Sequence, residues 1–213
     1  AKSFEISVFK ISSGIDDGAV INSKKFNLDV TDNIQTSYIK VSLCVASCIA
    51  KIYANKNLVK QALPQNGLEE YFPKRIPSDG AIDWKMDLKD IHNQIRALAD
   101  PYPNARTFLG KNEIMVKQST PIFSNISYDP GYITHKFPNG EFLVAAKGGY
   151  LLVNDYTTSC FSDLIKEGKT FRSIDMQIIV NKIVYRFNRE FPQKKLNRSL
   201  TYFWKSRGFK LNS

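Results

Sequence analysis

The chain has 213 residues, of which 43% are hydrophobic, and a formal net charge of +10. A chain of this length and composition can bury a core, which excludes a disordered tail. No apolar run approaches the roughly 20 residues of a membrane span, and the first residues do not resemble an export signal. The sequence therefore predicts a cytoplasmic protein without a membrane span.

The three cysteines, Cys44, Cys48 and Cys160, have no spacing typical of a metal site or a disulfide framework. This pattern fits a reducing compartment and predicts no bound metal. Cys44 and Cys48 are four residues apart in a segment with helical periodicity, so we expect both to be small apolar core residues.

The first hundred residues alternate between strand and helix patterns. Residues 4–11 alternate apolar and polar positions as a strand does, and a turn at 12–18 leads into a short strand at 19–21. Gly14 and Gly18 permit a tight reversal with Asp16 at the turn. A helix is predicted over 34–53, capped by Thr31 or Asp32, and another over 88–100, ended by two prolines. Between them, residues 64–83 read as an extended loop.

Beyond residue 105 the pattern changes to short β segments at 106–110, 113–120, 133–137, 140–148 and 150–157, separated by Gly, Pro and Asn turns. This spacing is typical of a small antiparallel barrel or sandwich. Helical periodicity returns at 175–187 and again at 200–204. We predict one domain over residues 1–104 and a β-rich second domain with a basic helical tail over 105–213.

The tail carries nine basic residues against one acid, Glu190: Lys182, Arg186, Arg189, Lys194, Lys195, Arg198, Lys205, Arg207 and Lys210. Such a segment attracts polyanions, which include nucleic acid, nucleotide diphosphates and anionic membrane surfaces. It is also typical of a solvated, solubilising surface. The sequence leaves both interpretations open.

Four segments, in order, resemble one family: SSGIDDGAVI, EEYFPKRIPSDGAIDW, IHNQIRALADPYPNARTFLGKNEIMV and NGEFLVAAKGGYLLVNDY. They resemble the folate-dependent formyltransferases, which include methionyl-tRNA formyltransferase and the sugar N-formyltransferases. The resemblance implies an α/β fold: the C-terminal part of a Rossmann-like domain with a parallel sheet, followed by a small barrel-like β domain and C-terminal helices. It also implies 10-formyltetrahydrofolate as the formyl donor.

In that family an asparagine and a histidine two residues apart act together with an aspartate in a downstream G-x-D-x-G loop. The resemblance makes Asp16 that aspartate, where a carboxylate orients the imidazole and takes up a proton as an amine attacks the formyl carbon. No N-x-H pair lies upstream of Asp16. The chain is therefore expected to lack the front of the catalytic domain and to be inactive alone. His92 and His135 lie downstream, in other contexts, and are expected to be structural.

The segment RALADPYPNA resembles the sugar enzymes more than the tRNA enzyme, which implies a nucleotide-linked amino sugar as acceptor. Lys74 and Arg75 are candidates to meet its diphosphate, and Tyr71, Phe72 and Trp84 to stack on a base or sugar ring. Trp84 is equally a candidate core residue, and Lys74 and Arg75 a solvated pair. A tRNA acceptor, and a non-catalytic binding or dimerisation module that forms a homodimer, remain as alternatives.

Overall fold

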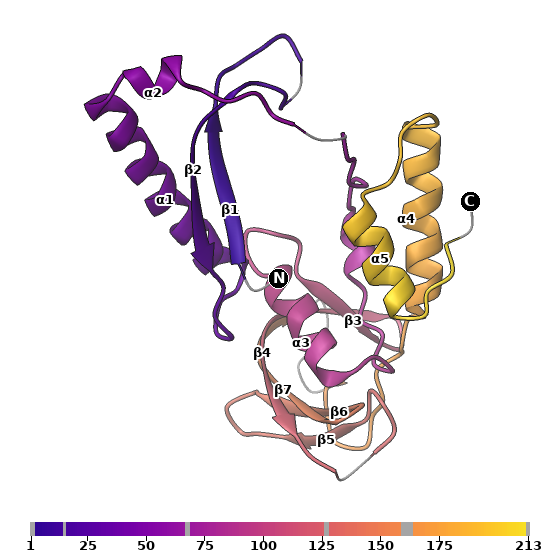
Figure 1. Cartoon of the computed structure of the whole chain (residues 1–213). Helices are drawn as coiled ribbons and strands as arrows, with labels where there is room; N and C mark the ends of the chain where they lie inside the picture. The colour runs from indigo at the N-terminus through magenta and orange to yellow at the C-terminus, as the bar shows by residue number, and fades with distance from the viewer. Residues whose placement is uncertain (1–2, 15, 67–68, 126–127, 159–163, 212–213) are drawn as a thin grey trace. The chain divides into compact units, whose positions relative to one another are not determined.

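The computed structural model describes residues 3–14, 16–66, 69–125, 128–158 and 164–211. It forms two compact units, residues 1–69 and 70–213 (Figure 1). The predicted division between residues 104 and 105 falls inside the second unit instead. The physical reason is that the helix over 88–97 shares one hydrophobic core with the strands that follow it.

The first unit is a hairpin covered by a helix. Strands β1 (Ser3–Phe9) and β2 (Val20–Asn27) pair antiparallel, with Ser3 opposite Asn27. Helix α1 (Ile34–Ala54) runs beside the hairpin and is followed by the short α2 (Asn57–Lys60). The second strand is longer than the predicted 19–21, because β1 supplies pairing partners for the polar residues that follow Ile21.

The N-cap of helix α1 is Asn33, and not Thr31 or Asp32 as predicted. The Asn33 side chain accepts from the Thr36 backbone N–H, and the Thr36 hydroxyl accepts from the Asn33 N–H, which forms a capping box. As predicted, Cys44 and Cys48 are buried.

By length and composition alone, α1 could cross a membrane, with a mean hydropathy of 1.3 over its best 18 residues. This finding differs from the prediction that no apolar run approaches the length of a membrane span. A core helix of a water-soluble protein meets the same criterion. This composition therefore establishes no membrane span.

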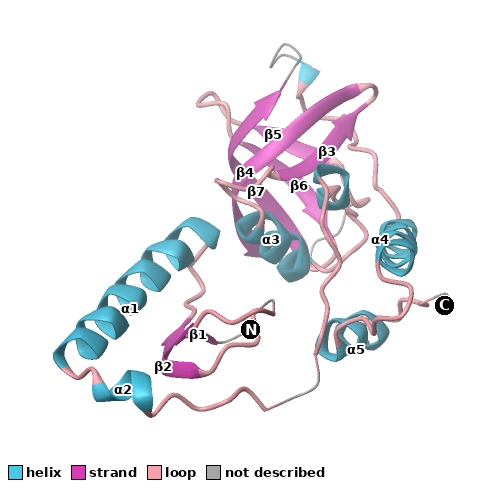
Figure 2. Ribbon diagram, turned by 90° about the horizontal axis from the view of Figure 1, so that it is seen from above, coloured by secondary structure: helices cyan, strands magenta, loops and turns pink. Residues whose placement is uncertain are grey.

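The second unit contains a five-stranded antiparallel sheet in the order β3-β4-β7-β6-β5. The strands are β3 (Ala105–Leu109), β4 (Asn112–Phe123), β5 (Ile133–Lys136), β6 (Phe142–Ala146) and β7 (Gly149–Thr158). Residues 169–172 hydrogen-bond to both sheet edges: Arg172 N–H to the Phe108 carbonyl and Phe171 N–H to the Gly131 carbonyl. The sheet is closed in this way, which agrees with the predicted barrel-like domain (Figure 2).

Helices cover this barrel. Helix α3 (Leu88–Ala97) buries Leu88, Ile91 and Ile95 against the strands, as its periodicity predicts. The 3₁₀ turn η1 (Pro77–Gly80) precedes it within the predicted loop. Helices α4 (Met176–Glu190) and α5 (Arg198–Ser206) share a second apolar cluster that contains Ala81 and Trp204. The strands of both described sheets pair antiparallel, so the described residues form no parallel sheet of the kind that the resemblance implies.

Candidate functional site

The loop between β1 and β2 presents Asp16 at its bend. Asp16 is exposed and has a left-handed backbone, with φ of 55°. Gly18 allows the return strand to approach closely, because a Cβ there would collide with the Lys10 carbonyl oxygen. Local backbone geometry therefore holds the carboxylate at the outside of the bend.

Gln65 fixes this bend from 49 residues away. Its Nε2 donates to the carbonyl oxygens of Asp16, at 2.9 Å, and Gly18, at 2.8 Å. Two further backbone bonds join Val20 and Leu63, so the segment around residues 63–65 pairs with the start of β2. Sequence reasoning missed Gln65, since nothing local to it signals so distant a partner.

The two neighbouring carboxylates have different surroundings. The Asp17 carboxylate accepts from the Ser12 hydroxyl, within the loop. No side chain or backbone group of the described residues pairs with the Asp16 carboxylate. Asp16 therefore has its full accepting capacity available, whereas Asp17 maintains the loop.

The predicted acceptor residues all belong to the other unit, residues 70–213. Tyr71 is half-buried, packs against the Phe191 ring at 5.6 Å and lies under the Lys194 ammonium at 4.8 Å. Phe72 is 66% exposed, and Lys74 is also exposed. The structure thus leaves Phe72 and Lys74 accessible, while Tyr71 is engaged by the C-terminal segment.

Arg75 belongs to a buried-carboxylate cluster. The Asp79 side chain is 4% exposed, and its Oδ2 lies 2.6 Å from Arg186 Nη2 and 3.5 Å from Arg75 Nε. Burial is the main cause that lowers the Arg75 pKa, and nearby Arg186 adds to it, while Asp79 opposes it. Two cations thus share one carboxylate, an arrangement that the separation of 107 residues hid from sequence analysis.

Trp84 is a core residue, and its predicted stacking on a ligand is not available in this structure. Its side chain is fully buried, its Nε1 donates to Thr107 Oγ1 at 2.9 Å, and its ring stacks on Phe171 at 5.7 Å. The burial of Trp84 agrees with the alternative interpretation from the sequence, in which Trp84 is a core residue.

Both histidines have local partners. His92 Nδ1 lies 3.1 Å from Ser119 Oγ, and burial, together with the nearby Arg96, lowers the His92 pKa. His135 Nδ1 lies 2.5 Å from Glu167 Oε1 at the surface. Among the described residues, no group of three or more His, Cys, Asp or Glu side chains is arranged to hold a metal.

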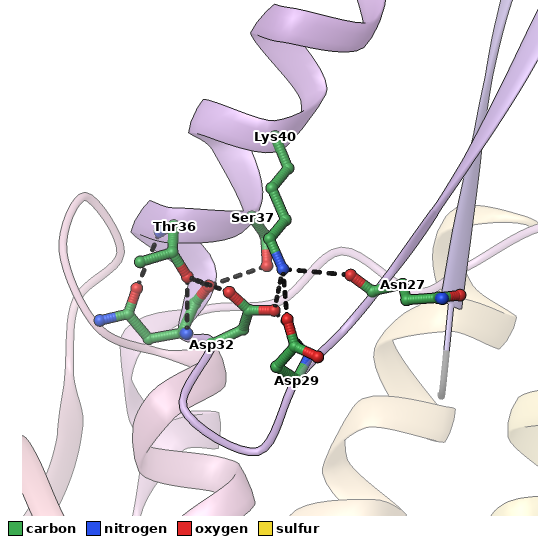
Figure 3. Close-up of polar contacts among 7 residues, drawn as sticks. Asn27, Asp29, Asp32, Thr36, Ser37 and Lys40 are labelled. Atoms are coloured by element: carbon green, nitrogen blue, oxygen red, sulfur yellow. Dashed lines mark hydrogen bonds and ion pairs between the residues drawn. The ribbon is translucent and has the colours of Figure 1, made fainter.

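A polar cluster joins the end of β2 to the start of α1 (Figure 3). Lys40 Nζ lies 3.0 Å from Asp29 Oδ2 and 2.5 Å from Asp32 Oδ2. Asp32 also accepts from the Asp29 N–H and the Thr36 hydroxyl. The Lys40 ammonium, then the Asp29 N–H, lower the Asp32 pKa to about 2. This cluster anchors α1 to the hairpin that carries Asp16.

Comparison with known protein families gives a match within the β-rich second unit. Residues 75–160 match the family described as "Formyl transferase, C-terminal domain". Bifunctional polymyxin resistance protein ArnA of Wigglesworthia glossinidia brevipalpis is 24% identical over 200 residues, covering 84% of this chain and 30% of the relative. Methionyl-tRNA formyltransferase of Desulforamulus reducens is 27% identical over 148 residues, covering 68% of this chain and 46% of the relative. The chain thus spans less than half the length of either relative.

Solved structures agree on the fold. HypX from Aquifex aeolicus, in complex with tetrahydrofolic acid, aligns with a TM-score of 0.62 at 14% identity, over 92% of this chain and 32% of HypX. An N-formyltransferase from Helicobacter canadensis, in complex with folinic acid and dTDP-3-aminofucose, aligns with a TM-score of 0.53 at 19% identity, over 73% of this chain and 56% of that enzyme. The family match, the two relatives and the shared fold support one conclusion: residues 75–160 match the formyl transferase C-terminal domain, and the chain as a whole is similar to formyltransferases.

Proposed function

We propose that the protein containing this chain transfers a formyl group from 10-formyltetrahydrofolate to the amine of a nucleotide-linked amino sugar, in the cytoplasm. The observation that carries the proposal is the exposed Asp16 carboxylate, held on a glycine-flanked bend and without a partner among the described residues. A carboxylate used for proton transfer needs such access to a reacting group.

The chemistry follows from what a carboxylate can do beside an attacking amine. As the amine nitrogen adds to the formyl carbon, the nitrogen becomes cationic and loses a proton. Asp16 accepts that proton, directly or through water, and also orients a neighbouring hydrogen-bond donor. The bound folate supplies the activated formyl group. We assign no described residue to the folate itself.

The Gln65 amide has a positioning role in this proposal. By holding the carbonyls of Asp16 and Gly18, it restricts the bend to one conformation without touching the reacting atoms. A fixed carboxylate reacts faster than a mobile one because less orientational freedom is lost at the transition state.

Support for the sugar acceptor comes from the segment Arg96–Ala105, which resembles sugar N-formyltransferases, and from the aminosugar nucleotide bound by the Helicobacter enzyme. Exposed Phe72 and Lys74 suit a ring and a diphosphate, respectively. Arg75 contributes less, since Asp79 already neutralises part of its charge.

A second candidate is formylation of methionyl-tRNA. It is favoured by the Desulforamulus relative, which is more similar to this chain in identity than ArnA is, and by the basic C-terminal segment. A tRNA acceptor would make activity fall steeply with salt, because phosphate contacts release counterions.

The experiment compares both acceptors with one donor. The protein is expressed from its complete gene and incubated with 10-formyltetrahydrofolate and either dTDP-3-aminofucose or methionyl-tRNA. Tetrahydrofolate release and the acceptor mass are followed. We expect release and a formylated product with the nucleotide sugar. Formylation of methionyl-tRNA and not of the nucleotide sugar would contradict the proposal and support the second candidate. If neither acceptor caused tetrahydrofolate release, the protein would be a non-catalytic binding or dimerisation module.

A further inference from the structure

The C-terminal helices carry a repeated pattern on their exposed faces. On α4, Lys182, Tyr185 and Arg189 follow at spacings of three and four residues. On α5, Arg198, Tyr202 and Lys205 follow at four and three. Residues so spaced share one helix face, so each helix presents a tyrosine between two cations about 10 Å apart along its axis.

These side chains are accessible. Tyr185 is 67% exposed and Tyr202 is 74% exposed. The four cations of the two triplets are exposed, and no described residue forms an ion pair or hydrogen bond with their side chains. Their charge is therefore uncompensated, unlike that of Arg186 and Arg207, which pair with Asp79 and Asp90.

Exposed cations that alternate with aromatic rings suit one class of ligand. Proteins that bind single strands combine positive charge for the phosphates with rings on which bases stack. Beside Tyr185, a hollow of about 390 Å³ is lined by Ile178, Asn181, Lys182, Tyr185 and Arg186. The Tyr185 ring, the uncompensated Lys182, the Asn181 amide and Arg186, which pairs with Asp79, thus line an open hollow large enough for a base and its phosphate.

The apolar faces of the helices argue against a membrane surface. A helix that lies on a bilayer buries a broad apolar face among the lipids. That face of α4, with Ile179, Val180 and Ile183, is already buried in the cluster that contains Ala81 and Trp204. What α4 and α5 leave exposed is mainly polar. The large apolar side chains among the exposed ones are scattered singly: Ile178, Tyr185, Tyr202 and Phe203.

We propose that the exposed faces of α4 and α5 bind single-stranded nucleic acid, with the cations on phosphates and Tyr185 and Tyr202 stacked on bases. Both helices lie outside the residues that match the family domain. The surface is therefore an addition to that domain. It goes beyond the proposed formylation of an amino sugar.

The test uses the 213-residue chain and a fluorescein-labelled twelve-nucleotide RNA without secondary structure, followed by anisotropy over a salt series. Tyr185→Ala with Tyr202→Ala should raise Kd about tenfold or more. Tyr185→Phe with Tyr202→Phe should restore binding, because the rings remain. Unchanged binding by the alanine pair, or no binding by the unaltered chain, would overturn the proposal.

A charge-matched pair separates a site from mere net charge. Lys182→Gln with Lys205→Gln should weaken binding and lower the slope of log K against log salt by about 1.4, the value for two lost single-strand phosphate contacts. Lys85→Gln with Lys89→Gln removes the same charge from exposed positions in the same unit and should have little effect. Equal losses in both pairs would contradict the proposal, as would binding to phosphatidylserine vesicles without binding to RNA.

Discussion

The two units of the chain are stabilised in different ways. Residues 70–213 contain a continuous core in which Trp84, Ile91, Ile114, Phe142 and Phe171 are at most 1% exposed. In the described part of residues 1–69, the buried hydrophobic side chains are Cys44 and Cys48 alone. Apolar burial is the main source of folding free energy, so the second unit gains more of its stability from its core than the first unit does. The first unit, which carries Asp16, depends more on its hairpin bonds and on the Asp29, Asp32 and Lys40 cluster.

The largest effect is expected in the core of the second unit. Trp84→Ala should lower the free energy of unfolding of that unit by about 3–5 kcal/mol, through lost burial and the cavity left behind. Urea denaturation followed by far-UV circular dichroism measures the loss. Phe72→Ala, at a 66% exposed position close in sequence, should change the stability by less than about 0.5 kcal/mol. Equal effects of the two variants would show that Trp84 is not part of the core.

The next effect concerns the carboxylate that ties α4 to η1. Asp79→Ala should destabilise the second unit by about 2–3 kcal/mol, because two arginines lose their shared partner and one of them, Arg186, has a buried Nε without an acceptor among the described residues. Arg75→Gln should cost less than about 1 kcal/mol, since its side chain is 52% exposed. Thermal denaturation of the two variants measures both losses of stability. A larger loss for Arg75→Gln than for Asp79→Ala would contradict the assigned geometry.

A smaller effect is expected in the first unit. Asp32→Asn should destabilise the attachment of α1 by about 1–2 kcal/mol, because the bond to Lys40 loses its charge. Hydrogen exchange of the α1 amides measures this opening locally. Faster exchange in α3 as well would mean that the two units do not unfold separately.

The same carboxylate sets a pH dependence. The Asp32 pKa is lowered from 3.8 to about 2, chiefly by the Lys40 ammonium. A lowered acid pKa stabilises the fold above the ordinary value, and that stability is lost as pH falls from about 4 towards 2. Exchange of the α1 amides should accelerate over this range, and Asp32→Asn should flatten the acceleration. An unchanged profile in the variant would assign the effect to another group.

Local sequence patterns predicted most elements correctly. Short β segments separated by Gly, Pro and Asn turns identified all five strands of the barrel, and the spacing of Leu88, Ile91 and Ile95 identified α3 and its buried face. The extent of β2 was underestimated, since polar residues after Ile21 carry no strand pattern and are ordered by pairing with β1. The unit boundary was placed too late in the chain, because proline breaks mark turns and not the limits of a core.

The site was less predictable than the fold. Asp16 came from the family resemblance, and its two glycines indicated the bend. The roles of Gln65 and Arg186 could not be inferred from the sequence. Gln65 is 49 residues from its partner Asp16, and Arg186 is 107 residues from its partner Asp79, so only folding brings these residues together. Trp84 was ambiguous, since an aromatic residue suits a core and a binding surface equally until its burial is known.

The central claim is that Asp16 performs the proton transfer while Asp17 maintains the loop. The most direct measurement is kcat/KM for tetrahydrofolate release by the protein expressed from its complete gene, with Asp16→Asn and Asp17→Asn as a matched pair. We predict a loss of about 10²–10⁴-fold for Asp16→Asn and only a few-fold for Asp17→Asn. Near-full activity of Asp16→Asn would contradict the account.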